Sequence, residues 1–336
     1  MEEDTPSPLL RGLAKRNLCC CVTGEGKPPI ALLLGAIACA GSGEIRGIPV
    51  EKLRADMLSS WYLEEDLMGR MIGPEGAMLI ASFIPVTAVL TYLDMSTNDI
   101  GDDGAKLIAE ALKANAVLTT LHLDHNRIGA EGAKAIAEAL KVNAVLTALH
   151  LQFENIGPEG AKAIAGALSS GTAVLTSLHL NGNNIGAEGA IAIAEALKVN
   201  AVLTSLSLGN DTIGNKGAKA IAGALSSGTA VLTELSLGNN QIGDEGANAI
   251  AEALKSGSTV LTLLHLGNNN IGDEGAEAIA GALSAGTARA HGRHWHAPAR
   301  RLALLTLDLK NNNLGDAGKQ AVRDAVEGRS RFVSYL

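Results

Sequence analysis

Large aromatic side chains are scarce in this chain of 336 residues. Phe, Trp and Tyr together make up 2% of the sequence, although hydrophobic residues make up 47%. The core must therefore consist of layered Leu, Ile, Val and Ala side chains, with little contribution from large rings.

A surplus of positive charge is also lacking. The formal net charge is -8 and the sequence pI is about 5.5. Proteins that hold nucleic acid mainly through phosphate contacts carry basic patches or stripes, and none runs along this sequence. We therefore expect no nucleic-acid partner.

Cysteine is confined to the first part of the chain, at Cys19, Cys20, Cys21 and Cys39. Paired cysteine clusters of the kind that cap secreted repeat proteins do not flank the remainder. This distribution favours a reducing compartment, and we expect a cytoplasmic protein. The three consecutive cysteines leave S-acylation open as an alternative.

A hydrophobic run long enough to cross a bilayer is missing. The apolar run at 30–40 is shorter than the roughly 20 residues that a membrane-spanning helix needs. No stable membrane span is expected. The run is compatible with a signal peptide, a peripheral anchor or part of a capping extension, and residues 1–47 are interpreted as an N-terminal extension, disordered or capping.

Catalytic motifs are lacking as well. The sequence contains no phosphate-binding loop with its lysine, no nucleophile elbow and no metal-binding helix motif. The abundant glycines recur as turn residues at a fixed spacing. We therefore expect no enzyme activity and no cofactor.

What the chain does contain is one repeated unit, Leu-x-x-Leu-x-Leu-x-x-Asn-x-Ile-Gly followed by Gly-Ala-x-x-Ile-Ala-x-Ala-Leu. Successive units are 28, 28, 29, 28, 29, 29 and 43 residues apart, and they open at Leu90, Leu118, Leu146, Leu175, Leu203, Leu232, Leu261 and Leu304. A unit this short cannot bury its own apolar face, so the units must stack into a solenoid.

Each unit combines a strand with a helix. In the unit that opens at Leu118, alternating leucines predict a short strand, and apolar residues at helical spacing predict a helix around 132–140. In units that read Ile-Gly-Asp-Glu-Gly, such as 242–246, the glycine permits a sharp entry and the aspartate is expected to cap the helix. The predicted fold is an α/β horseshoe with a parallel sheet on its concave side and helices on its convex side.

These repeats resemble the leucine-rich repeat superfamily over residues 90–326. The length of the unit and its full helix are similar to the ribonuclease-inhibitor-like class, which includes the repeat domains of NOD-like receptors of the NLRC3 type. No NACHT ATPase domain is recognised ahead of the repeats. The resemblance implies protein binding, and it also brings in activators of small GTPases as an alternative, because some family members stimulate Ran.

The resemblance implies a ladder of asparagines that bond to backbone groups in the turn after each strand. The ladder positions are Asn98, Asn126, Glu154, Asn183, Asp211, Asn240, Asn269 and Asn312. Neither Glu154 nor Asp211 can donate as an amide does. Glu154 has two interpretations: tolerated drift, or a modified rim that meets a ligand beside Phe153.

Equivalent residues of neighbouring parallel strands lie roughly 5 Å apart, so the concave face can be read in columns. The central column runs Asp94, His122, His150, His179, Ser207, Ser236, His265, Asp308. Its three adjacent histidines have three interpretations: solvated polar positions, a pH-tuned contact or metal ligands. Because only Asp124 offers a nearby carboxylate, we expect no metal site.

Side chains suited to binding gather in the first half of the repeats, whereas serine and glycine dominate the second half. The predicted partner-binding residues are Tyr92, Asp94, His122, Asp124, His125, Arg127, His150, Gln152, Phe153, Glu154 and His179.

The domain organisation follows from the repeats. Residues 48–89 are interpreted as a degenerate N-terminal capping unit, and residues 90–336 as eight repeats with a C-terminal cap that includes Phe332. The long final spacing predicts a basic loop at 287–301. Its three histidines, His291, His294 and His296, lack accompanying carboxylates or cysteines, so the sequence does not favour a metal there either.

The whole pattern predicts a noncatalytic scaffold or adaptor, monomeric, that binds a protein partner on its concave face. A regulator of a small GTPase and a structural spacer without a specific ligand are the alternatives.

Overall fold

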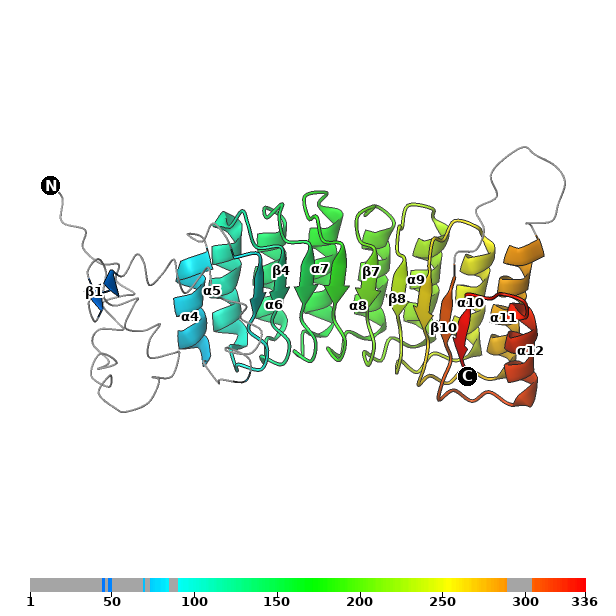
Figure 1. The fold of residues 1–336 in the computed structure, drawn as a ribbon. Coiled ribbons are helices and arrows are strands. Elements are labelled where there is room, and N and C mark those ends of the chain that lie inside the picture. The colour runs from blue at the N-terminus through cyan, green and yellow to red at the C-terminus, as the bar shows by residue number, and fades with distance from the viewer. Residues whose placement is uncertain (1–43, 46–47, 50–68, 70–72, 85–89, 289–303) are drawn as a thin grey trace, which may run out of the picture.

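The computed structural model describes residues 44–45, 48–49, 69, 73–84, 90–288 and 304–336. Within these residues, strand and helix alternate along an elongated solenoid (Figure 1). The strands form one layer and the helices form the other. The predicted extension at 1–47 and much of the predicted capping unit at 48–89 lie outside the described residues.

The described strands form one long parallel sheet and one short antiparallel pair. The nine-stranded sheet has the order β11-β10-β9-β8-β7-β6-β5-β4-β3, and the other sheet pairs β1 with β2. The strands are β1 (Glu44–Ile45), β2 (Ile48–Pro49), β3 (Tyr92–Asp94), β4 (Thr120–His122), β5 (Ala148–His150), β6 (Ser177–His179), β7 (Ser205–Ser207), β8 (Glu234–Ser236), β9 (Leu263–His265), β10 (Thr306–Asp308) and β11 (Val333–Tyr335).

One helix follows each strand from β3 to β10, and each helix packs against the next along the other layer. The helices are α4 (Gly73–Phe83), α5 (Gly101–Ala114), α6 (Ala130–Leu140), α7 (Gly157–Ser169), α8 (Gly186–Leu197), α9 (Gly214–Ser226), α10 (Asp244–Lys255), α11 (Asp273–Ala288) and α12 (Asp316–Val326). The predicted α/β leucine-rich repeat solenoid is confirmed.

The core lies between the two layers and is almost entirely aliphatic. The middle leucine of each strand from β3 to β10, such as Leu121 in β4, is buried, and so are alanines and isoleucines of the inward helix faces. Small residues let adjacent helices approach closely. A Cβ atom added at Gly132 would lie 2.9 Å from the Cβ atom of Ala105 on the preceding helix, so that glycine is required by packing.

The glycine at the start of each helix adopts one of two conformations. Gly101, Gly157, Gly186 and Gly214 have φ between 58° and 65°, whereas Gly129, Gly243 and Gly315 are extended, with φ between −100° and −79°.

The residue one repeat earlier accounts for this difference. A helix-start glycine is extended when the preceding repeat has Asp or Asn immediately after its own helix-start glycine. Asp102, which follows Gly101, is one repeat before the extended Gly129. Asp102 Oδ1 accepts hydrogen bonds from the backbone N–H groups of Gly129 (2.9 Å) and Gly132 (2.6 Å). When the preceding repeat has Pro or Ala at that position, the glycine N–H instead donates to the backbone carbonyl of the ladder residue in the next repeat. Gly157 N, for example, donates to Asn183 O at 2.9 Å.

The predicted role of the aspartate in helix capping therefore needs correction. Asp244 makes no side-chain cap to its own helix α10 but accepts from the N–H groups of Gly272 (2.7 Å) and Gly275 (2.9 Å), at the start of α11. These aspartates bond adjacent repeats to each other, which adds polar connections to the aliphatic core.

The C-terminal end is closed by a strand that the repeat pattern did not predict. β11 pairs with β10 in parallel, and Phe332 packs against the core beside it. The predicted loop at 287–301 lies largely outside the described residues. On either side of it, β9 and β10 pair in the register of the other strands, Leu264 opposite Leu307.

Candidate functional site

Three histidines form a stacked column on the exposed face of the sheet. The backbone register places His122, His150 and His179 side by side on β4, β5 and β6. The ring centroids of His122 and His150 are 3.8 Å apart with planes at 13°, and those of His150 and His179 are 4.2 Å apart with planes at 7°. Tyr92 extends the column at a tilted 5.1 Å from His122.

Partial burial keeps the middle of this column uncharged. Burial, and to a smaller extent positive charge on His122 and His179, lowers the pKa of His150 to about 3. Burial also lowers the pKa of His179. Neutral imidazoles at His150 and His179 stack without mutual repulsion, so these two rings form a flat, half-buried aromatic surface at neutral pH.

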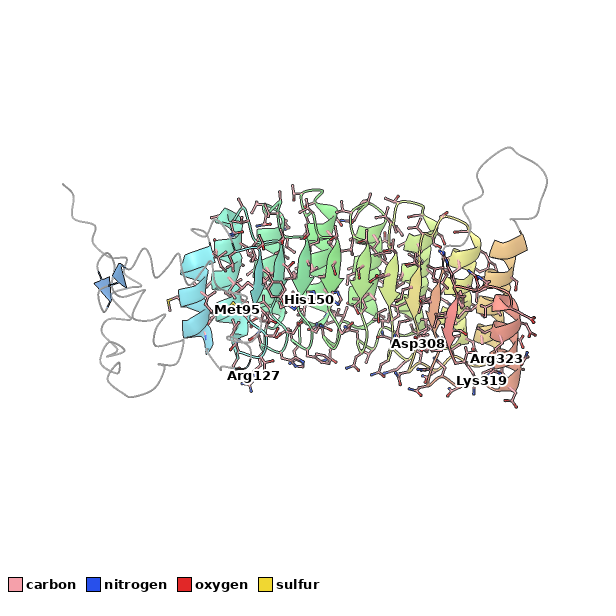
Figure 2. The ribbon with its side chains drawn as sticks, in the orientation of Figure 1. Met95, Arg127, His150, Asp308, Lys319 and Arg323 are labelled. Atoms are coloured by element: carbon pink, nitrogen blue, oxygen red, sulfur yellow. The ribbon has the colours of Figure 1, made fainter. Side chains whose placement is uncertain are left out.

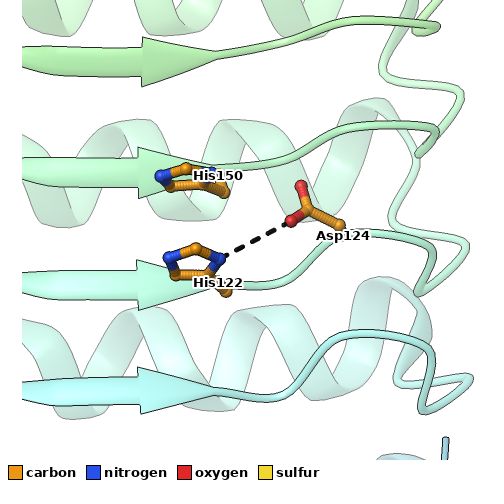
Figure 3. A group of neighbouring side chains, drawn as sticks. All are labelled: His122, Asp124 and His150. Carbon is orange, nitrogen blue, oxygen red and sulfur yellow. Dashed lines mark ion pairs between the residues drawn. The ribbon is translucent and has the colours of Figure 1, made fainter. Parts of the chain in front are cut away.

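Asp124 lies beside the column, just after the end of β4 (Figure 3). Its Oδ1 accepts a hydrogen bond from the backbone N–H of Gln152 at 2.6 Å, and its Oδ2 is 3.8 Å from Nδ1 of His122. Burial raises the pKa of the Asp124 carboxyl, while the Gln152 N–H and the charge of His122 oppose that shift. The backbone hydrogen bond thus fixes the carboxylate beside the first histidine.

A second pair of rings lies on the rim, in the turns that follow β4 and β5. His125 and Phe153 stack with centroids 4.5 Å apart and planes at 13°. Phe153 covers Gly182 of the next turn, where no space remains for a Cβ atom. Phe153 is 44% exposed, and His125 is also exposed.

Both rim residues have the left-handed backbone conformation, with φ at 57° for His125 and 58° for Phe153. Equivalent positions in later turns carry glycine or asparagine, as at Gly182 and Asn210. Bulky side chains are costly in this conformation, by roughly 1–2 kcal/mol per residue. Two adjacent repeats thus retain aromatic rings where the fold itself favours small residues.

Arg127 lies in the same turn as His125, at the lower edge of the solenoid in Figure 2. Its guanidinium forms an ion pair with Asp99 of the preceding turn at 2.8 Å, although its side chain remains 78% exposed. Asp99 was not among the predicted site residues. Asp99 and Arg127 occupy equivalent positions in successive turns, so comparing equivalent turn residues would have placed them side by side.

Gln152 and Asn181 connect the first half of the face to the second. The Asn181 amide donates to Gln152 Oε1 at 2.6 Å, while Asn181 Oδ1 accepts from Gly209 N and the Ser207 hydroxyl. Beyond them, Ser207 and Gly209 offer little side-chain area. Asn181 was also missed, because it falls just outside the central column.

The ladder side chains make inter-repeat hydrogen bonds. Asn126 Oδ1 accepts from the N–H of Asn98 at 2.8 Å, and its Nδ2 donates to the carbonyls of Met95 and Leu123. The amide oxygen thus accepts a hydrogen bond from the preceding turn, and the amide nitrogen donates to two carbonyls at the ends of strands.

Two carboxylates interrupt this ladder. Glu154 Oε1 and Oε2 accept from Asn126 N (2.6 Å) and Ile128 N (2.7 Å), and burial raises its pKa to about 8. Asp211 Oδ1 accepts from Asn183 N at 2.7 Å, its Oδ2 has no hydrogen-bond partner, and burial raises its pKa to about 7.

Two predicted partner-binding residues are therefore corrected. Glu154 is fully buried inside the ladder, so it presents no surface to a ligand. Asp94 is only 8% exposed, and its Oδ1 accepts from the N–H of Ser96 at 2.8 Å. The other predicted residues form three neighbouring groups: the column with Asp124 and Gln152, the rim rings, and Arg127.

Comparison with protein families identifies the repeats. The Leucine Rich repeat model matches at eight places, which together cover more than half of the chain: 88–109, 114–137, 142–165, 173–194, 199–222, 230–251, 257–280 and 304–322. The chain belongs to the leucine-rich repeat family. Repeats of this family generally mediate protein–protein interaction, and proteins built from them are typically noncatalytic interaction scaffolds.

A search of curated proteins gives no match. Among solved structures, the chain is similar to actin-binding site 2 of leiomodin-1, with 25% sequence identity and a TM-score of 0.30. That alignment covers 46% of this chain and 75% of the leiomodin-1 chain. A TM-score this low carries no argument about a shared function.

Within the part of the chain that the structure describes, no helix is long and apolar enough to cross a membrane.

Proposed function

We propose that the protein is a noncatalytic scaffold that binds a protein partner on the concave face of its first four repeats. The observation that carries this proposal is the pair of aromatic rings, His125 and Phe153, held at left-handed rim positions where later repeats have glycine or asparagine. Side chains that cost the fold free energy are characteristic of binding sites.

The surroundings of the rim support the same site. The strip of Tyr92, His122, His150 and His179 lies on the adjacent strands, and its rings are fixed by stacking before any partner arrives. Fixed side chains lose little conformational entropy on association, and aromatic residues and arginine dominate the energetics of interfaces. Arg127 contributes a cationic edge to this surface.

The proposal extends to the setting of the protein. A cytoplasmic monomer similar to the ribonuclease-inhibitor-like class accords with the repeat length and with the cysteine distribution. The GTPase-regulator alternative gains no support from Arg127, because its guanidinium is paired with Asp99. The other alternative, a structural spacer without a specific ligand, predicts that no partner is captured in the following experiment.

The test is capture of partners from a cell lysate by the full chain and two variants. The test variant carries Tyr92→Ala, His122→Ala, His150→Ala and Phe153→Ala. The control variant carries Glu234→Ala, Ser236→Ala and His265→Ala on the same face of later strands. We expect a partner that the wild type and the control retain and that the test variant loses. Retention by all three proteins would contradict the concave site, and no specific capture by any would favour the spacer.

A further inference from the structure

The histidine column and Asp124 together have the composition of a transition-metal site. One ligand atom each from His122, Asp124 and His150 can be chosen so that all three lie within 4.8 Å of one another. In a tetrahedral zinc site, bonds of about 2.0–2.1 Å separate neighbouring ligand atoms by roughly 3.4 Å. The side chains must rotate from the observed positions to bring these three atoms to that spacing.

From this arrangement we propose that His122, His150 and Asp124 bind a divalent transition-metal ion of the zinc class, with a fourth position open to water or to a side chain of a partner. The proposal replaces the expectation of no metal site that was drawn from the sequence, because the structure brings the Asp124 carboxylate to the two imidazoles. It goes beyond the scaffold function and does not depend on it. Two imidazoles and one carboxylate form a donor set that suits zinc and neighbouring ions, whereas magnesium and calcium prefer sites built from oxygen alone.

The carboxylate is oriented for this role by the backbone. The Gln152 N–H donates a hydrogen bond to Oδ1 of Asp124. The other oxygen, Oδ2, faces His122 and lies 3.8 Å from its Nδ1. Hydrogen bonds from surrounding groups that orient ligands in this way are a regular feature of metal sites. The carboxylate is 13% exposed and the His122 ring 21%, so an ion can reach them from the concave face.

His179, the third histidine of the column, packs against a ligand of the proposed site. Its Nε2 is 3.0 Å from the Ser177 hydroxyl, and its ring stacks on the far side of His150. His179 therefore limits the positions open to the His150 ring and is not proposed as a ligand. Coordination requires the rings of His122 and His150 to tilt out of their parallel stack, because parallel rings do not direct their nitrogen lone pairs at one point.

The chain contains a matched control on the same face. His265 Nε2 lies 3.0 Å from Asp308 Oδ2, and the two residues occupy the same column near the other end of the sheet. This pair has one imidazole and one carboxylate, and its register neighbour on β8 is Ser236. It lacks the second histidine that completes the proposed site.

The experiment is a titration of zinc into the full chain in a background that removes competing thiols and imidazoles. That background carries Cys19→Ser, Cys20→Ser, Cys21→Ser, Cys39→Ser, His291→Ser, His294→Ser and His296→Ser. Calorimetry gives the stoichiometry and affinity, and cobalt in place of zinc gives visible absorption that reports tetrahedral coordination.

We expect one zinc ion per chain in this background and no competition from excess magnesium. His122→Ala and His150→Ala should each weaken binding about tenfold or more, Asp124→Asn should weaken it less, and His265→Ala should leave it unchanged. His150→Phe keeps an aromatic ring in the stack without a ligand atom, so loss of zinc in this folded variant separates ligation from packing. No zinc binding in the background, or binding retained in His122→Ala and His150→Ala, would overturn the proposal.

Discussion

At the scale of single residues, the ladder shows how one atom changes the chemistry of a buried position. Where Asn183 uses Oδ1 to accept and Nδ2 to donate to the carbonyls of Leu151 and Leu180, Asp211 has a second oxygen in place of that nitrogen. Asp211 Oδ2 is buried without a hydrogen-bond partner. A proton on Oδ2 would restore a donor, which explains physically why burial favours the neutral acid.

We therefore predict that Asp211→Asn stabilises the fold, and more so at high pH. In the unfolded chain the carboxyl has its ordinary pKa of 3.8, and burial raises the pKa to about 7 in the folded protein. Below pH 3.8 Asp211 is protonated in both the folded and the unfolded state, and its contribution to the free energy of unfolding is most favourable. It falls as the pH rises to about 7, because the unfolded state releases its proton first.

Chemical denaturation should give a gain of about 1–3 kcal/mol for Asp211→Asn at pH 8 and a smaller gain at pH 5. The groups in contact with Asp211 are backbone amides of Asn183 and Ile185, and the flanking ladder side chain of Asn240 is a neutral amide. Asn240→Asp is the reverse control and should destabilise at pH 8. An equal gain at both pH values would contradict the assigned titration.

Phe153 illustrates a conflict between folding and binding at one residue. Replacing it with asparagine relieves left-handed strain of about 1–2 kcal/mol but loses the stack on His125, worth about 0.5–1.5 kcal/mol. We predict that Phe153→Asn changes the free energy of unfolding by less than about 1 kcal/mol, yet weakens partner capture at least tenfold.

The reciprocal change, Asn239→Phe, should cost about 1 kcal/mol and give no gain in binding. Denaturation midpoints and quantitative capture measure the two effects. A large loss of stability in Phe153→Asn would mean that the ring is retained for the fold.

At the scale of the elements, each helix entry is decided by a residue one repeat away. Gly157 has φ at 65° because Ala130 of the preceding repeat offers no acceptor, and Gly243 is extended because Asn215 Oδ1 accepts its N–H at 2.8 Å. This dependence extends over 27 or 28 residues, as the Asp102–Gly129 and Asn215–Gly243 bonds illustrate. A motif read within one repeat therefore could not predict which conformation its glycine adopts.

Substituting alanine at the two kinds of glycine should separate them. Gly157→Ala places a side chain at a left-handed position and should destabilise by about 1–2 kcal/mol. Gly243→Ala meets only ordinary contacts, the nearest at 3.6 Å, and should be neutral or slightly stabilising. Thermal unfolding of both variants checks the pair, and equal destabilisation would refute the two-conformation account.

The sequence predicted the elements well, because strand leucines such as Leu121 and helix residues such as Ile136 follow a strict period. It also predicted the column of His122, His150 and His179, since equal unit lengths fix the register of parallel strands. It did not predict the ring stacking, the orientation of Asp124 or the burial of Glu154. Those features depend on side-chain rotations and on contacts between turns, which spacing does not specify.

At the scale of the whole molecule, a parallel solenoid has two exposed sheet edges that need protection. β11 covers the C-terminal edge, where Leu309 N donates to Tyr335 O and Val333 N donates to Leu305 O, both at 2.8 Å. Without β11 the unpaired groups of β10 would be a template for pairing with another chain.

Deleting residues 331–336 should therefore lower the unfolding temperature and cause concentration-dependent self-association, measured by analytical ultracentrifugation. Tyr335→Ala is the control, because it removes an exposed ring and leaves the backbone bonds in place. Self-association of the control to the same extent would assign the effect to the ring that Lys310 covers at 4.4 Å, and not to the strand edge.

Site-specific photo-crosslinking would show directly whether a protein partner lies on the concave face of the early repeats. A photoreactive phenylalanine analogue replaces Ala148, on the exposed face of β5, or Lys162, on the solvent side of α7. We expect a partner protein to be crosslinked from position 148 and not from position 162. Crosslinking from position 162 alone, or from neither position, would contradict it.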